Sequence, residues 1–232
     1  MGLWSIGSVT DYKNHRVAVL GGGSFGTAIA NMIASNGYAV TLWLRSEVRA
    51  ASIRDSRENS DYLPGYQLHS AMEVSTDLEQ ALAGAQTVFF AVPSSSFREL
   101  AKRAFPFLNK DCVLVSTAKG IEAHSFMLPS EILEQEIPHC SVGVISGPNL
   151  AREIAQFEIT ATVIASENAE LCERIQTLLG SQYFRVYANH DRYGVELAGA
   201  LKNIYAIVAG IAEAMDVGQN TKAVVLTRSL AE

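Results

Sequence analysis

A glycine-rich turn constrains the fold of this chain more than any other feature of its sequence. Residues 17–30, VAVLGGGSFGTAIA, begin as an apolar β-branched run and end as a small-residue helix. Between them, Gly21, Gly23 and Gly26 follow the spacing G-x-G-x-x-G. One glycine makes the tight turn, one lets the backbone approach a pyrophosphate, and one brings the helix close to the strand. Because free N–H groups and the positive end of the helix dipole face such a turn, we predict that a pyrophosphate lies there. The alternatives are an ordinary glycine-rich turn and an adenosylmethionine-binding fold.

Short apolar runs alternate with amphipathic segments from residue 16 onward. This alternation is typical of βα units around a parallel sheet, and runs that are apolar throughout are typical of strands covered on both faces. The predicted strands are Val17–Leu20, Ala39–Leu44, Thr87–Val92, Cys112–Ser116, Val142–Ser146, Ala161–Ala165 and Phe184–Tyr187. The predicted helices are Phe25–Asn36, Ser46 to about Arg54, Asp77–Ala83, Ser96–Ala104, Pro129–Glu136, Leu150–Phe157 and Ala169–Leu179. We expect the stretch Arg57–His69, which contains a Pro-Gly turn, to be a loop.

The pattern changes after residue 190. A long helix is predicted from Tyr193 to about Met215, followed by a turn through Asp216 and Gly218 and a second helix. We therefore expect an N-terminal extension over residues 1–15 and an α/β domain of the Rossmann type over 16–190, with a mostly parallel sheet and helices on both faces. Residues 191–232 are expected to begin an all-helical domain. A helical region of about 40 residues is too short to hold its own core, so we expect it to be incomplete or completed by a partner.

Composition excludes several classes of function. The net charge of −6 and the pI of about 5.4 provide no basic field for nucleic acid or anionic membranes. The three cysteines, Cys112, Cys140 and Cys172, have no CxxC spacing, which favours buried thiols in a reducing compartment. The histidines have no metal-ligand spacing, so we predict no metal site.

The chain is also expected to be soluble and cytoplasmic. Its first residues lack the basic and apolar regions of a secretion signal, and Ile6 stands where a myristoylation signal needs Ser or Thr. The longest apolar stretch near the C-terminus is interrupted by polar residues, which argues against a lipid-spanning helix. These residues are Glu196, Lys202, Asn203 and Glu213.

Arg45 indicates which dinucleotide is preferred. An NAD-preferring site places Asp or Glu at the end of the second strand, about 20 residues beyond the turn, to bind the ribose hydroxyls. Here that strand ends in Arg45, which can pair with a 2′-phosphate, and Arg49 lies one helical turn later. NADP(H) is therefore favoured and NAD(H) remains possible, since Glu47 is a nearby acceptor. The alternative is that Arg45 is a solvated charge at the strand end.

Two lysines are candidates for the chemistry. Lys119 follows a predicted strand at the edge where open α/β sheets bind ligands, and the turn 146–149 (SGPN) follows the next strand. Lys202 lies in a predicted helix that is apolar on nearly all sides, and its side chain points back over Gly199 and Ala198. We expect its ammonium to be desolvated, and such an amine exchanges protons near neutral pH. The alternatives are a surface lysine at 119 and a structural lysine at 202.

Seven stretches together resemble the NAD(P)-dependent glycerol-3-phosphate dehydrogenase family, from about residue 16 to the end. They are VAVLGGGSFGTAIA (17–30), NSDYLPG (59–65), AVPS (91–94), AKGIE (118–122), SGPNLAREI (146–154), GVELAGALKNIYAI (194–207) and NTKA (220–223). The resemblance implies reversible hydride transfer between sn-glycerol 3-phosphate and NAD(P)+, giving dihydroxyacetone phosphate for phospholipid synthesis. It also implies a small-molecule substrate and a possible homodimer.

The resemblance further implies roles for particular residues. Lys202 would be the catalytic lysine, and the substrate would meet Lys119, Gly147, Asn149 and Asn203. The cofactor would touch Gly21, Gly23, Ser24, Phe25, Gly26, Arg45, Lys119 and Ala151. The family usually has Ser or Thr where this chain has Asn149, and its remaining catalytic Asp and phosphate-binding Arg-Asn pair would lie beyond Glu232. A non-catalytic NADPH-binding module and another two-domain hydroxyacid or keto-acid reductase are the alternative functions.

Overall fold

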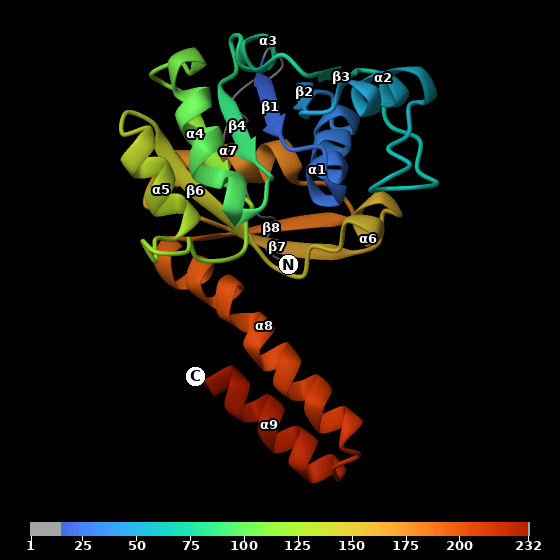
Figure 1. Cartoon of the computed structure of the whole chain (residues 1–232), viewed down its shortest axis with the longest axis vertical. Helices are drawn as coiled ribbons and strands as arrows, with labels where there is room; N and C mark the ends of the chain where they lie inside the picture. Colours follow the sequence, from blue (N-terminus) through green and yellow to red (C-terminus); the bar gives the residue numbers. More distant parts are fainter. Residues whose placement is uncertain (1–14, 232) are drawn as a thin grey trace, which may run out of the picture.

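The computed structural model describes residues 15–231, and the strands among them form one eight-stranded sheet (Figure 1). The strand order is β3-β2-β1-β4-β5-β6-β7-β8, and all neighbours are parallel except β6 and β7. The strands are β1 Arg16–Leu20, β2 Ala39–Trp43, β3 Met72–Ser75, β4 Thr87–Phe90, β5 Val113–Ser116, β6 Ser141–Ser146, β7 Thr160–Ala165 and β8 Phe184–Asn189. The mostly parallel sheet predicted from the sequence is confirmed.

Helices cover both faces of the sheet because successive strand residues point to opposite cores. On β1, Val17 and Val19 belong to one core, with α1, α2, α6 and α7, and Ala18 and Leu20 belong to the other, with α3, α4 and α5. The helices are α1 Ser24–Ser35, α2 Glu47–Ser56, α3 Leu78–Leu82, α4 Phe97–Ala104, α5 Pro129–Glu136, α6 Ala151–Ala155 and α7 Ala169–Leu179, with 3₁₀ turns at Ser94–Ser96 and Phe105–Phe107. The Rossmann-type architecture is therefore the one that the alternating pattern predicts.

Two features of the sheet were not specified by the sequence prediction. The strand β3 was not predicted: it is only four residues long, and it pairs with β2 alone at the edge of the sheet. The pair β6–β7 is antiparallel, although the apolar runs of both strands look like those of the parallel strands. A short edge strand and the direction of pairing leave little trace in the hydrophobic pattern.

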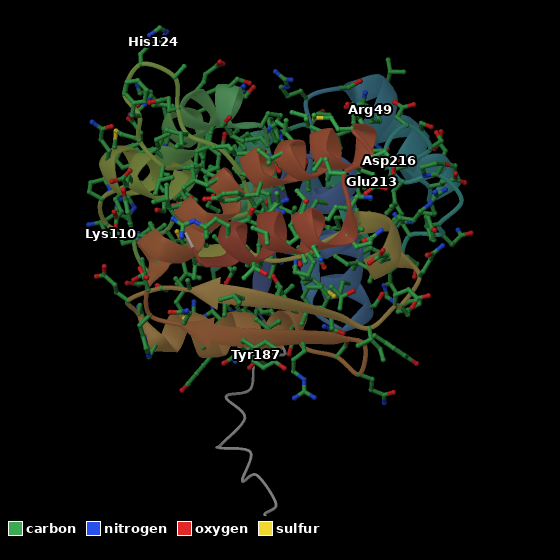
Figure 2. The ribbon with its side chains drawn as sticks, turned by 90° about the horizontal axis from the view of Figure 1, so that it is seen from below. Arg49, Lys110, His124, Tyr187, Glu213 and Asp216 are labelled. Atoms are coloured by element: carbon green, nitrogen blue, oxygen red, sulfur yellow. The ribbon has the colours of Figure 1, made fainter. Side chains whose placement is uncertain are left out.

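The last two helices project from the domain. Helix α8 spans Arg192–Ala214 and α9 spans Gln219–Ala231, and Figure 1 shows α8 leaving the sheet with α9 folded back beside it. Seen from below in Figure 2, Glu213 and Asp216 lie near the far end of this pair. By length and composition alone, α8 is apolar enough to cross a membrane, and 11% of its most apolar window is buried. That polar residues keep this helix out of lipid stays a prediction; these residues are Glu196, Lys202, Asn203 and Glu213.

The predictions about the N-terminus concern residues 1–15, and of these the structure describes only His15. That side chain is 4% exposed, and its Nε2 is 2.8 Å from the Thr87 hydroxyl on β4. The expected extension over residues 1–15, the lack of a leader and the statement about Ile6 otherwise fall outside the described residues. The three cysteines are buried and free, as the sequence predicts.

Candidate functional site

The site begins where the strand order reverses. From β1 the chain continues to β2 on one side, while β4 pairs with β1 on the other side. In open α/β sheets the crevice at such a point, outside the carboxyl ends of the strands, is where ligands bind. The turn from Gly21 to Gly26 lies at this end of β1 and leads directly into α1.

Two of the glycines are required by the close packing of the protein backbone. Gly21 has φ +129°, and a Cβ there would lie 2.3 Å from the carbonyl oxygen of Ala91. A Cβ on Gly26 would lie 2.0 Å from the carbonyl oxygen of Gly21. The turn therefore approaches the segment after β4, and α1 approaches the turn, more closely than any side chain would allow. Gly21 and Gly26 therefore shape the turn.

Gly23 differs, because apart from its two chain neighbours none of the described residues lies within 4 Å of where its Cβ would be. Its backbone angles, φ −77° and ψ −178°, are ones that any residue adopts. No side chain caps the N-terminus of α1 there, and its first turn has no acidic residue. A bare backbone facing open space at an uncapped helix N-terminus fits an anionic group, and a dinucleotide pyrophosphate fits this position.

A buried asparagine holds the turn from the other side. The Asn59 side-chain amide donates to the carbonyl of Gly22 over 3.0 Å and to the hydroxyl of Thr27 over 2.8 Å. Asn59 is 1% exposed and Thr27 is fully buried. The sequence assigns Asn59 no role of its own, because a hydrogen bond across 37 positions leaves no mark in the local residue pattern.

Two contiguous cavities extend from the turn. They have volumes of about 350 and about 460 Å³ and share Gly23, Ala91, Val92 and Pro93 in their walls. The smaller cavity is lined by Ser24, Phe25, Gly26, Lys119 and Asn149 among others, and the larger by Gly21, Arg45, Arg49 and Tyr62 among others. The structure therefore brings most of the predicted cofactor residues to one crevice.

The larger cavity carries positive charge at the end of β2. Arg45 is exposed there. Arg49 lies on α2, marked in Figure 2, where its Nε is 2.8 Å from the Asp61 carboxylate and its guanidinium stacks over Tyr62. Arg49 is thus partly neutralised, while Arg45 makes no ion pair with any of residues 15–231 and can offer its charge to a phosphate.

Glu47 is occupied by other partners. Its carboxylate accepts a hydrogen bond from the Thr76 hydroxyl over 2.6 Å and pairs with Arg54. These bonds lower the pKa of Glu47. The acceptor that would favour NAD(H) is therefore engaged by Thr76 and Arg54. Arg45 lines the larger cavity, and Glu47 does not.

The smaller cavity extends to Lys119. Its ammonium donates to the carbonyl of Gly147 over 3.3 Å, which joins the segment after β5 to the turn after β6. The pKa of Lys119 is lowered, because its ammonium is partly desolvated and because the charge of Lys202 is nearby. The charge of Lys202 thus acts on Lys119, although 83 positions separate the two lysines in the sequence.

Asn149 presents an acceptor without a partner. Its amide nitrogen donates to the Thr162 hydroxyl over 3.0 Å, and Thr162 in turn donates to the carbonyl of Ser146. The other side-chain atom, Oδ1, is buried and has no hydrogen-bond partner among the described residues. A buried acceptor beside a cavity is suited to a ligand hydroxyl or amide.

Lys202 is not desolvated as expected. Lys202 and Asn203 are both exposed, and the ammonium donates to the Asn203 side-chain oxygen over 3.3 Å. The prediction of a buried amine is wrong for the described chain because α8 leaves the sheet after Gly199. A helix sequence that is apolar on nearly all sides does not reveal which of its faces pack against other elements. Isoleucines 204, 207 and 211 on this helix are exposed as well.

The remaining predicted residue, Ala151, lies at the start of α6. It is half-buried against the core and lines neither cavity. Within residues 15–231, no three His, Cys, Asp or Glu side chains are grouped so as to bind a metal ion.

The fold and the site define a Rossmann-type dinucleotide-binding protein with a cationic end to its crevice. The chain belongs to the NAD-dependent glycerol-3-phosphate dehydrogenase family: the family model for the N-terminal domain matches residues 16–172, and the one for the C-terminal domain matches residues 191–232.

Individual relatives agree with this assignment. The chain is 57% identical over 216 residues to a Pseudomonas aeruginosa (strain LESB58) protein named glycerol-3-phosphate dehydrogenase (NAD(P)+), covering 93% of this chain and 63% of that protein. It is 56% identical to a protein of the same name from Teredinibacter turnerae, covering 94% and 64%. A solved Coxiella burnetii glycerol-3-phosphate dehydrogenase superposes with a TM-score of 0.88 at 35% identity, covering 94% of this chain and 67% of that one. The chain thus spans less than two thirds of the length of the first two relatives.

Proposed function

We propose that this chain forms the cofactor-binding part and the first catalytic elements of an enzyme that transfers hydride reversibly between sn-glycerol 3-phosphate and NAD(P)+. The product of oxidation is dihydroxyacetone phosphate. The observation that carries the proposal is the cavity that joins the bare backbone of Gly23 to Lys119 and Asn149. The names of the relatives support the substrate.

The turn and the larger cavity bind the cofactor in this proposal. Gly21 and Gly26 shape the turn, and the backbone N–H groups at Gly23, Ser24 and Phe25 receive the pyrophosphate. Arg45 pairs with a 2′-phosphate, so NADP(H) is favoured and NAD(H) is accepted. Lys119 meets the nicotinamide, and Ala151 also touches the cofactor. When bound, the nicotinamide gives or accepts the hydride.

The lysines and the turn after β6 act on the substrate. Lys202 donates a proton to the C2 oxygen as the ketone is reduced, and takes it back during oxidation. Lys119 supplies positive charge for the developing alkoxide and helps to hold the substrate. The Asn149 oxygen, Gly147 and Asn203 contact the substrate's polar groups. The exposure of Lys202 means that exclusion of water from this amine must come from further protein.

The experiment is to follow NADPH oxidation with dihydroxyacetone phosphate. It uses this chain, the chain extended with the C-terminal third of the Pseudomonas aeruginosa relative, and the extended protein carrying Lys202→Ala. We expect NADPH binding by both forms, turnover mainly by the extended form, and a large loss in the variant. Lack of turnover by the extended form would disprove the reaction, and full activity of Lys202→Ala would disprove the assigned acid.

A second candidate is a non-catalytic NADPH-binding module, which the exposure of Lys202 favours for the 232-residue chain by itself. It predicts binding of NADPH without turnover of any carbonyl compound, in the extended form too. A keto-acid reductase would oxidise NADPH with a keto acid and not with dihydroxyacetone phosphate. We further propose that the protein acts in the cytoplasm, where free Cys112, Cys140 and Cys172 persist, and that it forms a homodimer.

A further inference from the structure

The contact between α8 and α5 contains a buried carboxyl group that none of these roles uses. Glu196 on α8 is 4% exposed, and Ser130 on α5 is 2% exposed. The Glu196 carboxyl group accepts a hydrogen bond from the backbone N–H of Ser130 over 3.1 Å and another from the Ser130 hydroxyl. Because Pro129 is the first residue of α5 and has no N–H, Ser130 carries the first free donor of that helix. A glutamate of one helix therefore caps another.

Placing a carboxyl group here has a cost, because burial removes water from its charged form. Burial raises the pKa of Glu196 to about 7, and the negative charge of Glu131 on α5 acts in the same direction. The bonds from Ser130 and the positive charge of Arg192 act in the opposite direction. Arg192 itself pairs with Glu134 of α5 over 2.7 Å. An apolar side chain would fill the same space without this cost, so mere packing does not explain the carboxyl group.

The position of Glu196 on α8 relates it to Lys202. Glu196, Gly199 and Lys202 are spaced three residues apart, so the row turns by about 60° at each step. Glu196 and Gly199 are the buried residues along α8. A Cβ on Gly199 would lie 2.7 Å from the Ser146 hydroxyl oxygen, which shows how closely the helix approaches the turn after β6. Lys202 comes one step beyond these two contacts, at the point where the helix leaves the domain.

We propose that Glu196 is a positioning residue whose hydrogen bonds to Ser130 set the direction of α8 and thereby hold Lys202 one helical turn beyond the approach of Gly199 to Ser146 in the turn 146–149. This inference rests on the proposed dehydrogenase function for its catalytic consequence. The effect of the Lys202 charge on the pKa of Lys119 does not depend on that function.

The catalytic test uses the extended protein and a matched pair of variants. Glu196→Gln keeps an oxygen that accepts from the Ser130 N–H, while Glu196→Met has a similar length and no such acceptor. We expect kcat to fall on the order of 100-fold in the Met variant, because a misplacement of about 1 Å has that effect. The Gln variant should recover most of the activity, and the KM for NADPH should stay unchanged in both. Glu213→Met makes the same replacement at an exposed position of α8, where the carboxylate pairs only with Lys222 in the structure, and should leave kcat unchanged.

A second readout needs no turnover. In the 232-residue chain, the pH dependence of Lys119 acylation reports its pKa, which the charge of Lys202 lowers. Glu196→Met should shift this profile upward, toward the profile of Lys202→Ala, and Glu196→Gln should not. If the Met variant does not fold, Ser130→Ala takes its place, because this change removes only the hydrogen bond from the Ser130 hydroxyl. We expect it to lower kcat and to raise the Lys119 profile, each by less than Glu196→Met would.

The outcomes separate the two proposals. If the extended protein does not turn over dihydroxyacetone phosphate, the proposed function fails, and the Lys119 profile alone decides the role of Glu196. If it does turn over, an unchanged kcat in a folded Glu196→Met variant overturns the positioning role. Equal losses in the Gln and Met variants, or a loss of NADPH affinity parallel to the loss of kcat, would also overturn it, because they would indicate a general structural effect.

Discussion

Adding one methyl group at Gly23 should separate cofactor binding from folding. In Gly23→Ala the new Cβ meets none of the described residues within 4 Å, and the backbone angles are ordinary ones for alanine. The stability of the unliganded protein should therefore change by less than about 1 kcal/mol. In the complex, the methyl group would occupy the space that the pyrophosphate approaches. Overpacking of this kind costs about 1–3 kcal/mol, which corresponds to an affinity about 5 to 150 times weaker.

The assay is calorimetric titration with NADPH, together with unfolding in the presence and absence of the cofactor. NADPH at 100 times its Kd should stabilise the parent by about 2.7 kcal/mol, and a variant that binds 100 times more weakly by only about 0.4 kcal/mol at the same concentration. Gly210→Ala on α8 is the matched control, because among residues 15–231 its Cβ also meets nothing within 4 Å beyond its own helix, and it should bind NADPH normally. Gly26→Ala should lower stability, since its Cβ would lie 2.0 Å from a carbonyl oxygen. Normal NADPH affinity in a folded Gly23→Ala protein would refute the reasoning.

Three further outcomes follow from the geometry. Arg45→Asp should weaken the binding of NADPH far more than that of NADH in paired titrations, and equal losses would remove the 2′-phosphate argument. Asn59→Asp replaces the amide donor with a carboxylate oxygen facing the carbonyl of Gly22, so denaturant unfolding at neutral pH should show a loss of about 1–3 kcal/mol; unchanged stability would show that this bond is dispensable. The pKa of Glu196, about 7 when folded against an ordinary 4.5, means that the folded state holds an extra proton between these values. Stability should therefore fall by about 3 kcal/mol as the pH rises through that window, and Glu196→Gln should lack this part of the slope; an identical slope in both proteins would contradict the shift.

The sequence was sufficient for the parts of the fold that repeat a local pattern. The helices Pro129–Glu136 and Ala169–Leu179 have the predicted bounds, because their capping residues and apolar spacing act within a few positions. The turn after β1 was readable for the same reason. Strand Met72–Ser75 escaped prediction because four residues with one exposed glutamate contain too little alternation to mark a strand.

The parts of the site that depend on distant contacts were not readable. The sequence assigned no role to Asn59, because its hydrogen bond to Gly22 spans 37 positions. It showed Glu196 only as a polar interruption of an apolar helix, because the hydrogen bond from Ser130 spans 66 positions. The expected burial of Lys202 failed for a related reason. Hydrophobic composition shows that a helix needs covering, but not which of its faces this chain covers.

The most direct measurement of the central claim is a crystal structure of the chain soaked with NADPH. The account predicts the pyrophosphate at the N-terminus of α1, against the bare backbone of Gly23, with the 2′-phosphate near Arg45 and the nicotinamide toward Lys119. A crevice that stays empty at saturating NADPH, or a pyrophosphate bound elsewhere on the chain, would contradict it.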